Sequence, residues 1–419
     1  MGSYKFSLMK INRKISPDLK SKQNFITKKR LKENEINFDN LRSYRLDRVK
    51  SELKKNNLEA CILFDPINIR YALDTVNMSI YNMHNLTRYC FIPVDGPIIL
   101  YEYFNCEGLS KHLNLINEIR PAITWDYFSN GDQASLQLKK WIDEIKDLSN
   151  SHFKSKKVAI DVINGPAVTA LNNTGINVVD AKLILEQARV IKSTEELKCM
   201  KAAIEVAEIG ITKMKNELKA GMTEDELWSI LHKTNIEHGG EWIECRILSS
   251  GERTNPWMQE SSNKIIQSGE IVSFDTDMVG PYGYCADISR AFVEGNKFND
   301  EQKKLYSMAV DQINHNYRII KPGVSFKEFT ERSWTLPDEY YGNRYSVMLH
   351  GIGMCDEWPA IRYPTDGGQR NGQFEKNMTI TLESYIGKVG GKEGVKLEQQ
   401  YLVGENGLEL MSHHPLEDI

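Results

Sequence analysis

The chain has 419 residues, of which 41% are hydrophobic and 26% charged, and its formal net charge is −4. These values are typical of a soluble globular protein with two or three domains, and no apolar run approaches the ~20 residues of a membrane span. Seven cysteines without a Cys-x-x-Cys pair, and an N-terminus without an apolar signal-peptide core, predict a cytoplasmic protein without a structural zinc site.

The N-terminal 60 residues are basic. They hold 16 Lys and Arg against 7 Asp and Glu, a net charge of +9, so the remainder of the chain carries about −13. A basic arm can bind nucleic acid or anionic lipid, but this one has neither an aromatic stacking pattern nor Gly-rich spacing. We therefore predict a solvated arm at 1–40, then a surface helix around LRSYRLDRVKSELKKNNL, with neither nucleic acid nor a membrane as partner.

Strand and helix patterns alternate over residues 41–188, which we predict to be an α/β domain. A buried strand and a loop are expected at 59–75, two strands around Asp-Gly-Pro at 88–103, and another strand at 156–164. A helix is expected at 133–147.

A second domain is predicted over residues 189–419. It opens with a helix at 192–218 that carries a capping box, Ser193 and Glu196, and a second capped helix follows at 223–240. Strands are expected to dominate from there to the C-terminus.

Three aspartates lie close together in SFDTDMVGPYGYCADISRAF, residues 273–292. Because strand side chains alternate between faces, Asp275 and Asp277 are expected on one face, roughly 7 Å apart. A hairpin turn at Gly280–Gly283 would bring Asp287 back beside them. Three converging carboxylates are unfavourable unless a cation joins them.

The second domain holds three further candidates for this cation site. His350 is expected in a Gly-flanked turn within SVMLHGIGMCDEWP, and Glu383 and Glu398 on the alternating strands NMTITLESYIG and GVKLEQQYLV. Singly, such residues are typical of structural histidines and salt-bridged strand glutamates. Together with the aspartates they suit Mn, Fe, Co or Zn, and carboxylates that can bridge suit two ions ~3.5–4 Å apart.

The order Asp-x-Asp, Asp, His-Gly-x-Gly, Glu, Glu resembles the creatinase/methionine aminopeptidase/prolidase family. The resemblance runs from about residue 43 to the C-terminus and implies an α+β fold: a creatinase-like N-terminal α/β domain and a C-terminal pita-bread catalytic domain. It also implies a homodimer in which the N-terminal domain of one chain closes the site of the other. The metal ligands it implies are Asp275, Asp287, His350, Glu383 and Glu398.

The spacing of the first two ligands departs slightly from the family pattern. The usual interval is some eleven residues, whereas Asp287 lies twelve after Asp275 and ten after Asp277. Asp277 matches no ligand of the peptidases, but it stays a candidate here. The implied cofactor is a divalent metal, as two ions, with iron favoured and zinc or manganese compatible with the same ligands.

Two histidines of the family's peptidases are missing. The segment SSGERTNPWMQE, residues 249–260, contains none, and the position seven residues after His350 is Glu357. In the peptidases these histidines hold the scissile carbonyl and the tetrahedral intermediate, so their loss removes help that amide hydrolysis needs.

The chain resembles a branch of the family that is not peptidolytic, the dimethylsulfoniopropionate (DMSP) lyases of the DddP type. The matching segments are NIRYALDTVNMSIYNMHNLTRY, DTDMVGPYGYCADISR, YSVMLHGIGMCDEWP and ESYIG. The resemblance implies a metal-dependent carbon–sulfur lyase that releases dimethyl sulfide and acrylate by β-elimination, with Asp356 as the base. Aromatic faces can hold a sulfonium by cation–π attraction, and the expected substrate contacts are Tyr345, Tyr81, Trp358 and Trp257.

The sequence is also compatible with three other functions. They are a Xaa-Pro dipeptidase-like metallopeptidase with an altered pocket, a creatinase-like hydrolase, and a non-catalytic binding protein on the same fold.

Overall fold

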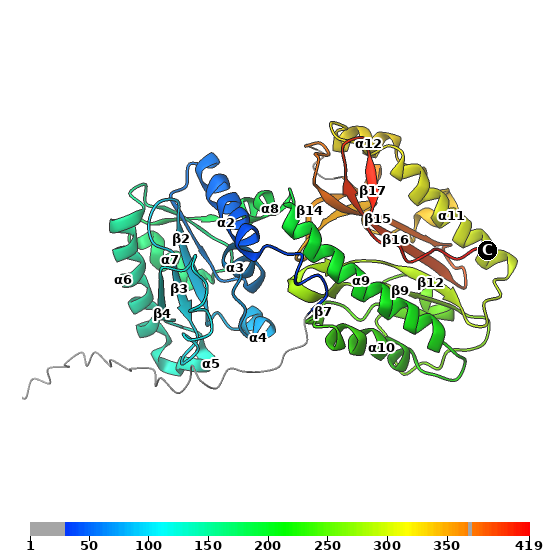
Figure 1. The fold of residues 1–419 in the computed structure, drawn as a ribbon, viewed down its shortest axis with the longest axis horizontal. Helices are drawn as coiled ribbons and strands as arrows, with labels where there is room; N and C mark the ends of the chain where they lie inside the picture. The colour runs from blue at the N-terminus through cyan, green and yellow to red at the C-terminus, as the bar shows by residue number, and fades with distance from the viewer. Residues whose placement is uncertain (1–29, 368–370) are drawn as a thin grey trace, which may run out of the picture.

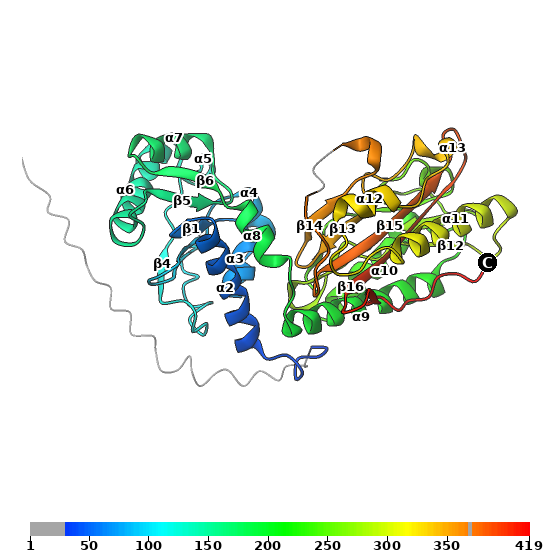
Figure 2. The ribbon, with the colours of Figure 1, turned by 90° about the horizontal axis from the view of Figure 1, so that it is seen from above.

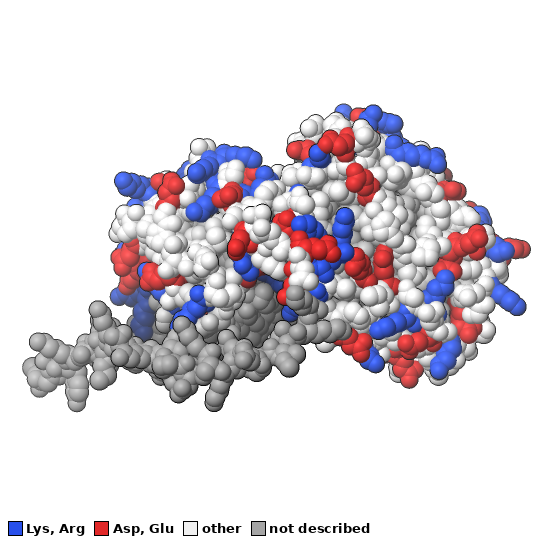
Figure 3. Space-filling model, in the orientation of Figure 1, with Lys and Arg blue, Asp and Glu red and all other residues white. Residues whose placement is uncertain are grey.

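The computed structural model describes residues 30–367 and 371–419 (Figure 1). Most of the predicted basic arm, residues 1–29, lies outside the described residues. On the face shown in Figure 3, Lys and Arg side chains are interspersed with Asp and Glu over both domains.

The N-terminal domain is a six-stranded sheet between two layers of helices, with the strand order β4-β3-β2-β1-β5-β6. Successive residues of β1 face opposite layers: Ile62 belongs to the same hydrophobic core as Trp141 of α6, whereas Cys61 belongs to the core that includes Val49 of α2. The strands are β1 Ala60–Leu63, β2 Tyr89–Pro93, β3 Ile99–Glu102, β4 Glu118–Pro121, β5 Lys157–Ile160 and β6 Asn177–Asp180. The helices are α2 Phe38–Lys55, α3 Pro66–Leu73, α4 Ser79–His84, α5 Tyr127–Asn130, α6 Ala134–His152, α7 Gly165–Asn173 and α8 Lys182–Arg189.

The predicted strands and the α6 helix of this domain are confirmed, but the expected loop after β1 is wrong. That segment is the helix α3, because Pro66 opens it and the side chain of Asp65 accepts the backbone N–H groups of Ile67 and Asn68. The surface helix α2 is also more buried than expected, since Val49 and Leu53 are fully enclosed.

The C-terminal domain begins with α9 and α10, and both predicted helices are confirmed with their capping boxes, Ser193–Glu196 and Thr223–Glu226. Strands dominate after these two helices, as predicted, but the sequence analysis did not identify the 18-residue α11, which packs on β15 and β16. The capping box of α11, Asn299 and Gln302, could have predicted where this helix begins. The helices are α9 Thr194–Glu217, α10 Glu224–Glu237, α11 Asp300–Tyr317, α12 Phe326–Arg332 and α13 Asp338–Tyr341.

Three antiparallel sheets lie between these helices: β11-β10-β7, β12-β9-β8 and β14-β13-β15-β16-β17. Figure 1 shows α9 and α10 on one side of the strands and α11 and α12 on the other, and Figure 2 shows α8 and the start of α9 connecting the two domains. The strands are β7 Trp242–Ile243, β8 Leu248–Ser250, β9 Ile271–Phe274, β10 Met278–Val279, β11 Cys285–Ala286, β12 Arg290–Val293, β13 Leu349–Ile352, β14 Asp356–Ile361, β15 Thr379–Gly387, β16 Gly394–Val403 and β17 Leu408–Leu410.

Two interruptions in this strand framework position the candidate site. β10 pairs with β11 across the predicted turn, and β9 pairs with β12. Between these two paired stretches, residues 275–277 and residues 287–289 are unpaired and lie opposite each other. The long strand β16 contacts both β9 and β12. None of the helices in the described ranges has both the length and the apolarity that crossing a bilayer requires.

Candidate metal centre

The three aspartates meet where the two interrupted strands face each other. Asp275 and Asp277 follow β9 rather than lying on a strand, so the expected strand alternation is wrong there. Asp277 has a φ of 37°, a left-handed conformation that few non-glycine residues adopt. The hydroxyl of Thr276 joins the two interruptions: it donates to the carbonyl of Ala286 (2.7 Å) and accepts the N–H of Ile288 (3.0 Å). Asp275, Asp277 and Asp287 each offer an oxygen within 4.8 Å of the others.

The imidazole and the two glutamates come from one face of the five-stranded sheet. His350 lies on β13, not in a turn, and Glu383 of β15 stands directly opposite Glu398 of β16. His350 Nε2 lies 3.2 Å from Glu383 Oε1, 3.5 Å from Asp287 Oδ2 and 3.7 Å from Glu398 Oε1. His350 Nδ1 lies 3.0 Å from the carbonyl of Gly351. A proton on Nδ1 would serve that contact and leave Nε2 free as a ligand.

The electrostatics of this cluster favour a bound cation. Like charges directly opposite on neighbouring strands are destabilising. Burial and the neighbouring Glu398, Asp275 and Asp277 raise the pKa of Asp287 well above its usual range, and burial with Asp275 and Asp356 raises the pKa of Asp277 to about 8. Burial lowers the pKa of His350, but the hydrogen bond to Glu383 and the nearby carboxylates outweigh it and raise this pKa to about 10.

The donor set fits divalent metal ions. Among the described residues, Asp277 Oδ2, Asp287 Oδ1 and Glu398 Oε1 are buried oxygens without a hydrogen-bond partner. Two overlapping groups of donors share one residue, Asp287: it lies with Asp275 and Asp277 on one side, and with His350 and Glu398 on the other. The four carboxylates of these two groups, with Glu383 beside His350 as a fifth, suit Fe, Mn or Zn together with one imidazole. A carboxylate that two groups share could bridge two ions.

Lys396, which the sequence analysis missed, completes the cluster. Its fully buried ammonium lies 2.9 Å from Asp275 Oδ2, 2.7 Å from Glu383 Oε2 and 3.2 Å from Glu398 Oε2. The sequence could have predicted this position, because Lys396 precedes Glu398 by two residues on the same strand and therefore lies on the same face of β16.

Two of the four predicted substrate-binding aromatics border this cluster. The Lys396 ammonium lies 4.8 Å from the ring centroid of Tyr345 and 5.7 Å from that of Trp257. The ring of Trp358 packs instead on Phe326.

The fourth predicted substrate contact, Tyr81, lies in the N-terminal domain. It is on α4, where its ring meets Tyr103. The expected substrate contacts of all four aromatics stay predictions.

Asp356 lies at the mouth of the cluster as the first residue of β14. Its carboxylate is 64% exposed, and Oδ1 lies 3.6 Å from His350 Nδ1. Partial burial raises its pKa, the charge of His350 opposes this, and Glu383 and Asp275 add to the rise. A carboxylate with a raised pKa is a stronger base than a free one, so the position and chemistry of Asp356 both suit proton abstraction.

Glu357, which stands where the peptidases have their second histidine, turns away from this mouth into the protein. Its side chain is 1% exposed and pairs with Lys192 Nζ at 2.7 Å and Arg189 Nε at 3.1 Å. It also accepts the N–H of Met354 at 3.1 Å. Glu357 therefore anchors β14 to the segment between the domains and is placed as a structural residue, not as a base.

Replacing Glu357 by alanine should lower the free energy of unfolding by about 3–5 kcal/mol, because the buried Lys192 would lose its acidic partner. Arg189 would lose one of its two acidic partners and keep Glu186. Urea unfolding followed by fluorescence measures this. Glu331→Ala is the matched control: Glu331 pairs with Lys327 at 3.8 Å on the surface, with side chains 63% and 74% exposed, and should cost less than about 1 kcal/mol. Equal losses in the two variants would contradict the anchoring role.

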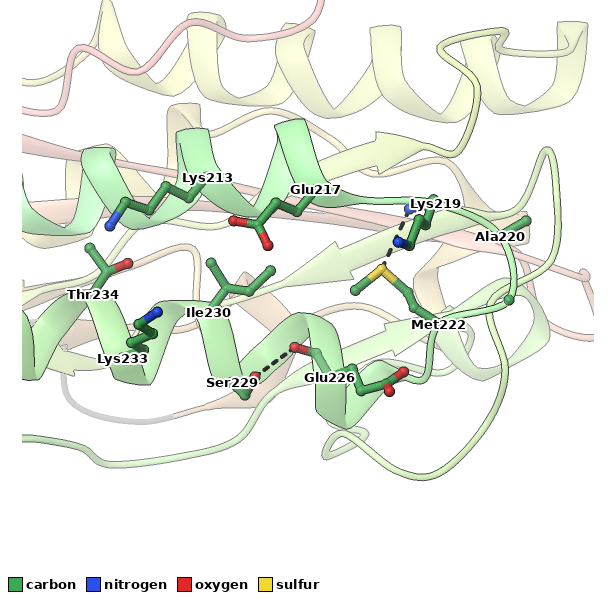
Figure 4. Close-up of a pocket in the computed structure, with 11 residues that line it drawn as sticks. Lys213, Glu217, Lys219, Ala220, Met222, Glu226, Ser229, Ile230, Lys233 and Thr234 are labelled. Atoms are coloured by element: carbon green, nitrogen blue, oxygen red, sulfur yellow. Dashed lines mark hydrogen bonds between the residues drawn. The ribbon is translucent and has the colours of Figure 1, made fainter.

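A wide groove in the C-terminal domain lies away from this chemistry. It has a volume of about 1010 Å³ and runs between α9 and α10 (Figure 4). Its lining mixes lysines, glutamates and the thioether of Met222, and it contains none of the candidate ligands. The candidate site is thus defined by its donor atoms and not by the size of a cavity.

Comparison with known proteins agrees with this geometry. Metallopeptidase family M24 matches residues 198–405. Dimethylsulfoniopropionate lyase DddP of Roseovarius nubinhibens is 35% identical over 387 residues, 90% of this chain and 86% of the relative; the protein of the same name from Roseobacter denitrificans is 34% identical over the same length. A Xaa-Pro dipeptidase of Pyrococcus horikoshii is 29% identical over 230 residues, 54% of this chain and 63% of the relative.

Solved structures show the same fold. The Xaa-Pro dipeptidase from Bacillus anthracis has a TM-score of 0.72 at 19% identity and covers 90% of this chain and 98% of its own. The X-Pro aminopeptidase from Thermotoga maritima has a TM-score of 0.70 at 22% identity, and the match covers 88% of this chain and 98% of the aminopeptidase. The predicted α+β architecture with a pita-bread domain is confirmed.

Proposed function

We propose, from the premise that the chain belongs to the DddP family of dimethylsulfoniopropionate lyases within metallopeptidase family M24, that it cleaves DMSP to dimethyl sulfide and acrylate. The observation that carries the proposal is the combination at one site of a complete ligand set with a carboxylate base and no peptidase imidazole. Asp356 lies beside His350, and neither residues 249–260 nor position 357 offers a histidine.

The metal-binding residues would be Asp275, Asp277, Asp287, His350, Glu383 and Glu398, with two divalent ions as the proposed content. Iron is favoured and zinc or manganese is compatible with the same donors. When bound, the metal supplies Lewis-acid stabilisation of the negative charge that develops on the substrate carboxylate.

The chain's own part in the reaction centres on Asp356. Its carboxylate takes the proton from the α-carbon of the substrate, the C–H electron pair becomes the new C=C bond, and the C–S bond breaks. The sulfonium leaves as neutral dimethyl sulfide, so no acid is needed to protonate the leaving group. Because the side chain is 64% exposed, the proton can pass from Asp356 to solvent and restore the base.

Tyr345 and Trp257 are proposed to border the bound substrate. Both rings already face the ammonium of Lys396, which supports a pocket wall that tolerates positive charge. Trp358 would contribute only if its ring left its packing on Phe326.

We further propose a cytoplasmic homodimer in which the N-terminal domain of one copy closes the site of the other. Tyr81 on α4 would then reach the substrate of the second copy. Large apolar side chains on the surface of this domain support the pairing, among them Phe104, Tyr127 and Phe128 at 74%, 77% and 79% exposure. The seven cysteines all lie in the described ranges and none is in a disulfide there, which supports a reducing compartment.

Headspace analysis of purified protein should detect dimethyl sulfide on addition of DMSP, with one acrylate formed for each dimethyl sulfide. The alternative, a Xaa-Pro dipeptidase-like metallopeptidase, is favoured by the ligand set alone. A parallel assay of proline release from Xaa-Pro dipeptides with added Mn²⁺ discriminates the two. Faster turnover of the dipeptides than of DMSP would refute the lyase assignment.

A further inference from the structure

Lys396 is a cation built into the centre of the candidate metal site. Its side chain is fully buried on β16, and its Nζ lies within 3.2 Å of one oxygen each from Asp275, Glu383 and Glu398. A fourth contact, 2.6 Å to the hydroxyl of Ser289, joins it to the interruption after β11. An ammonium has three donors, so these four contacts leave none for a substrate.

The carboxylate oxygens divide between two positive groups. Glu383 and Glu398 turn their Oε2 atoms toward Lys396, whereas their Oε1 atoms lie 3.2 and 3.7 Å from His350 Nε2. Lys396 therefore fixes the orientation of both glutamates through oxygens on the side away from His350. The Oε1 atoms are held toward His350 and Asp287, where the metal donors gather.

Charge balance gives the ammonium a second role. Asp275, Asp277, Asp287, Glu383 and Glu398 carry five negative charges when ionised, and two divalent ions supply only four positive ones. Lys396 supplies the fifth. Without any metal it is the one permanently charged cation that contacts these carboxylates among the described residues, since His350 can lose its proton.

We propose that Lys396 is a resident cation of the centre, which compensates the negative charge of Asp275, Glu383 and Glu398 and keeps the metal-free protein folded. The inference concerns the proposed metal centre and not the lyase reaction. Burying ionised carboxylates without a partner is strongly unfavourable, so removal of the ammonium should harm the empty centre most. Bound divalent ions would offset much of the missing charge.

Thermal unfolding of metal-stripped protein, with and without saturating Mn²⁺, tests this proposal. Lys396→Met keeps the length of the side chain and removes its charge. The stripped variant should unfold on the order of 5–10 °C below stripped wild type, and the gap should shrink by at least half with Mn²⁺. By linkage, the apparent Kd for Mn²⁺ should fall about tenfold. Lys396→Gln, which is polar but neutral, should behave in the same way.

Lys192→Met is the matched control, because Lys192 is equally buried and ion-paired, at 2.7 Å to Glu357, but contacts none of the candidate ligands. It should lower both melting temperatures by the same amount. The proposal is overturned if Lys396→Met does likewise, if Lys396→Gln matches wild type, or if Lys396→Met fails to fold even with saturating Mn²⁺. No substrate is used, so failure of the lyase assay would leave these outcomes unchanged.

Discussion

Asp287→Ala should remove the metal and the turnover of the protein together. Asp287 is the carboxylate that both groups of donors share, one with Asp275 and Asp277 and the other with His350 and Glu398. Loss of a shared ligand opens both positions at once. Elemental analysis should fall from about two ions per chain to a background level, and dimethyl sulfide release should become undetectable.

Asp277→Ala is the discriminating control for this prediction. Asp277 belongs to one donor group only, and the group around His350 keeps all its members without it. The variant should therefore retain roughly one ion per chain and a melting temperature close to that of wild type. Full metal content in Asp287→Ala, or activity that survives a strong chelator in wild type, would contradict the assignment of this centre.

The candidate ligands could be predicted because their signals are local in sequence. Glu383 and Glu398 occur at alternating positions of two strong strand patterns, and the structure pairs them directly across β15 and β16. The convergence of Asp275 and Asp287 followed from the turn at Gly280–Gly283. The argument from strand alternation was incomplete, because the aspartates lie outside the strands. They lie in the two interruptions that the hydroxyl of Thr276 connects.

What could not be predicted depends on contacts between distant segments. The role of Glu357 is set by Lys192 and Arg189, more than 160 residues earlier, and no local pattern marks that pairing. The partners of Trp358 likewise come from α12. The position of Lys396 could be predicted only in part. The alternation of side chains along β16 places it on the same face as Glu398, but its burial among three acids depends on the packing of two sheets against each other.

Asp356→Asn should retain metal and substrate binding and reduce kcat by roughly 10²–10⁴, the usual contribution of a general base. The substitution keeps the shape of the side chain and removes its basicity. Metal binding should survive because Asp356 is 64% exposed and approaches His350 on Nδ1, not on the Nε2 atom that faces the other ligands. Metal content, the KM for DMSP and the rate of dimethyl sulfide release, measured on the same preparation, separate these effects.

Glu244→Gln is the control that tests whether the base is Asp356 and not a neighbouring acid. Burial, together with the charges of Asp356 and Asp65, raises the pKa of Glu244 to about 7, so Glu244 is a carboxylate near Asp356 with the basicity that proton abstraction needs. If Asp356 is the base, Glu244→Gln should keep most of the turnover. The reverse pattern, with Asp356→Asn active and Glu244→Gln inactive, would move the base to Glu244. In deuterated solvent, exchange at the α-carbon of unreacted DMSP, present in wild type and lost in Asp356→Asn, would show that Asp356 removes this proton before the C–S bond breaks.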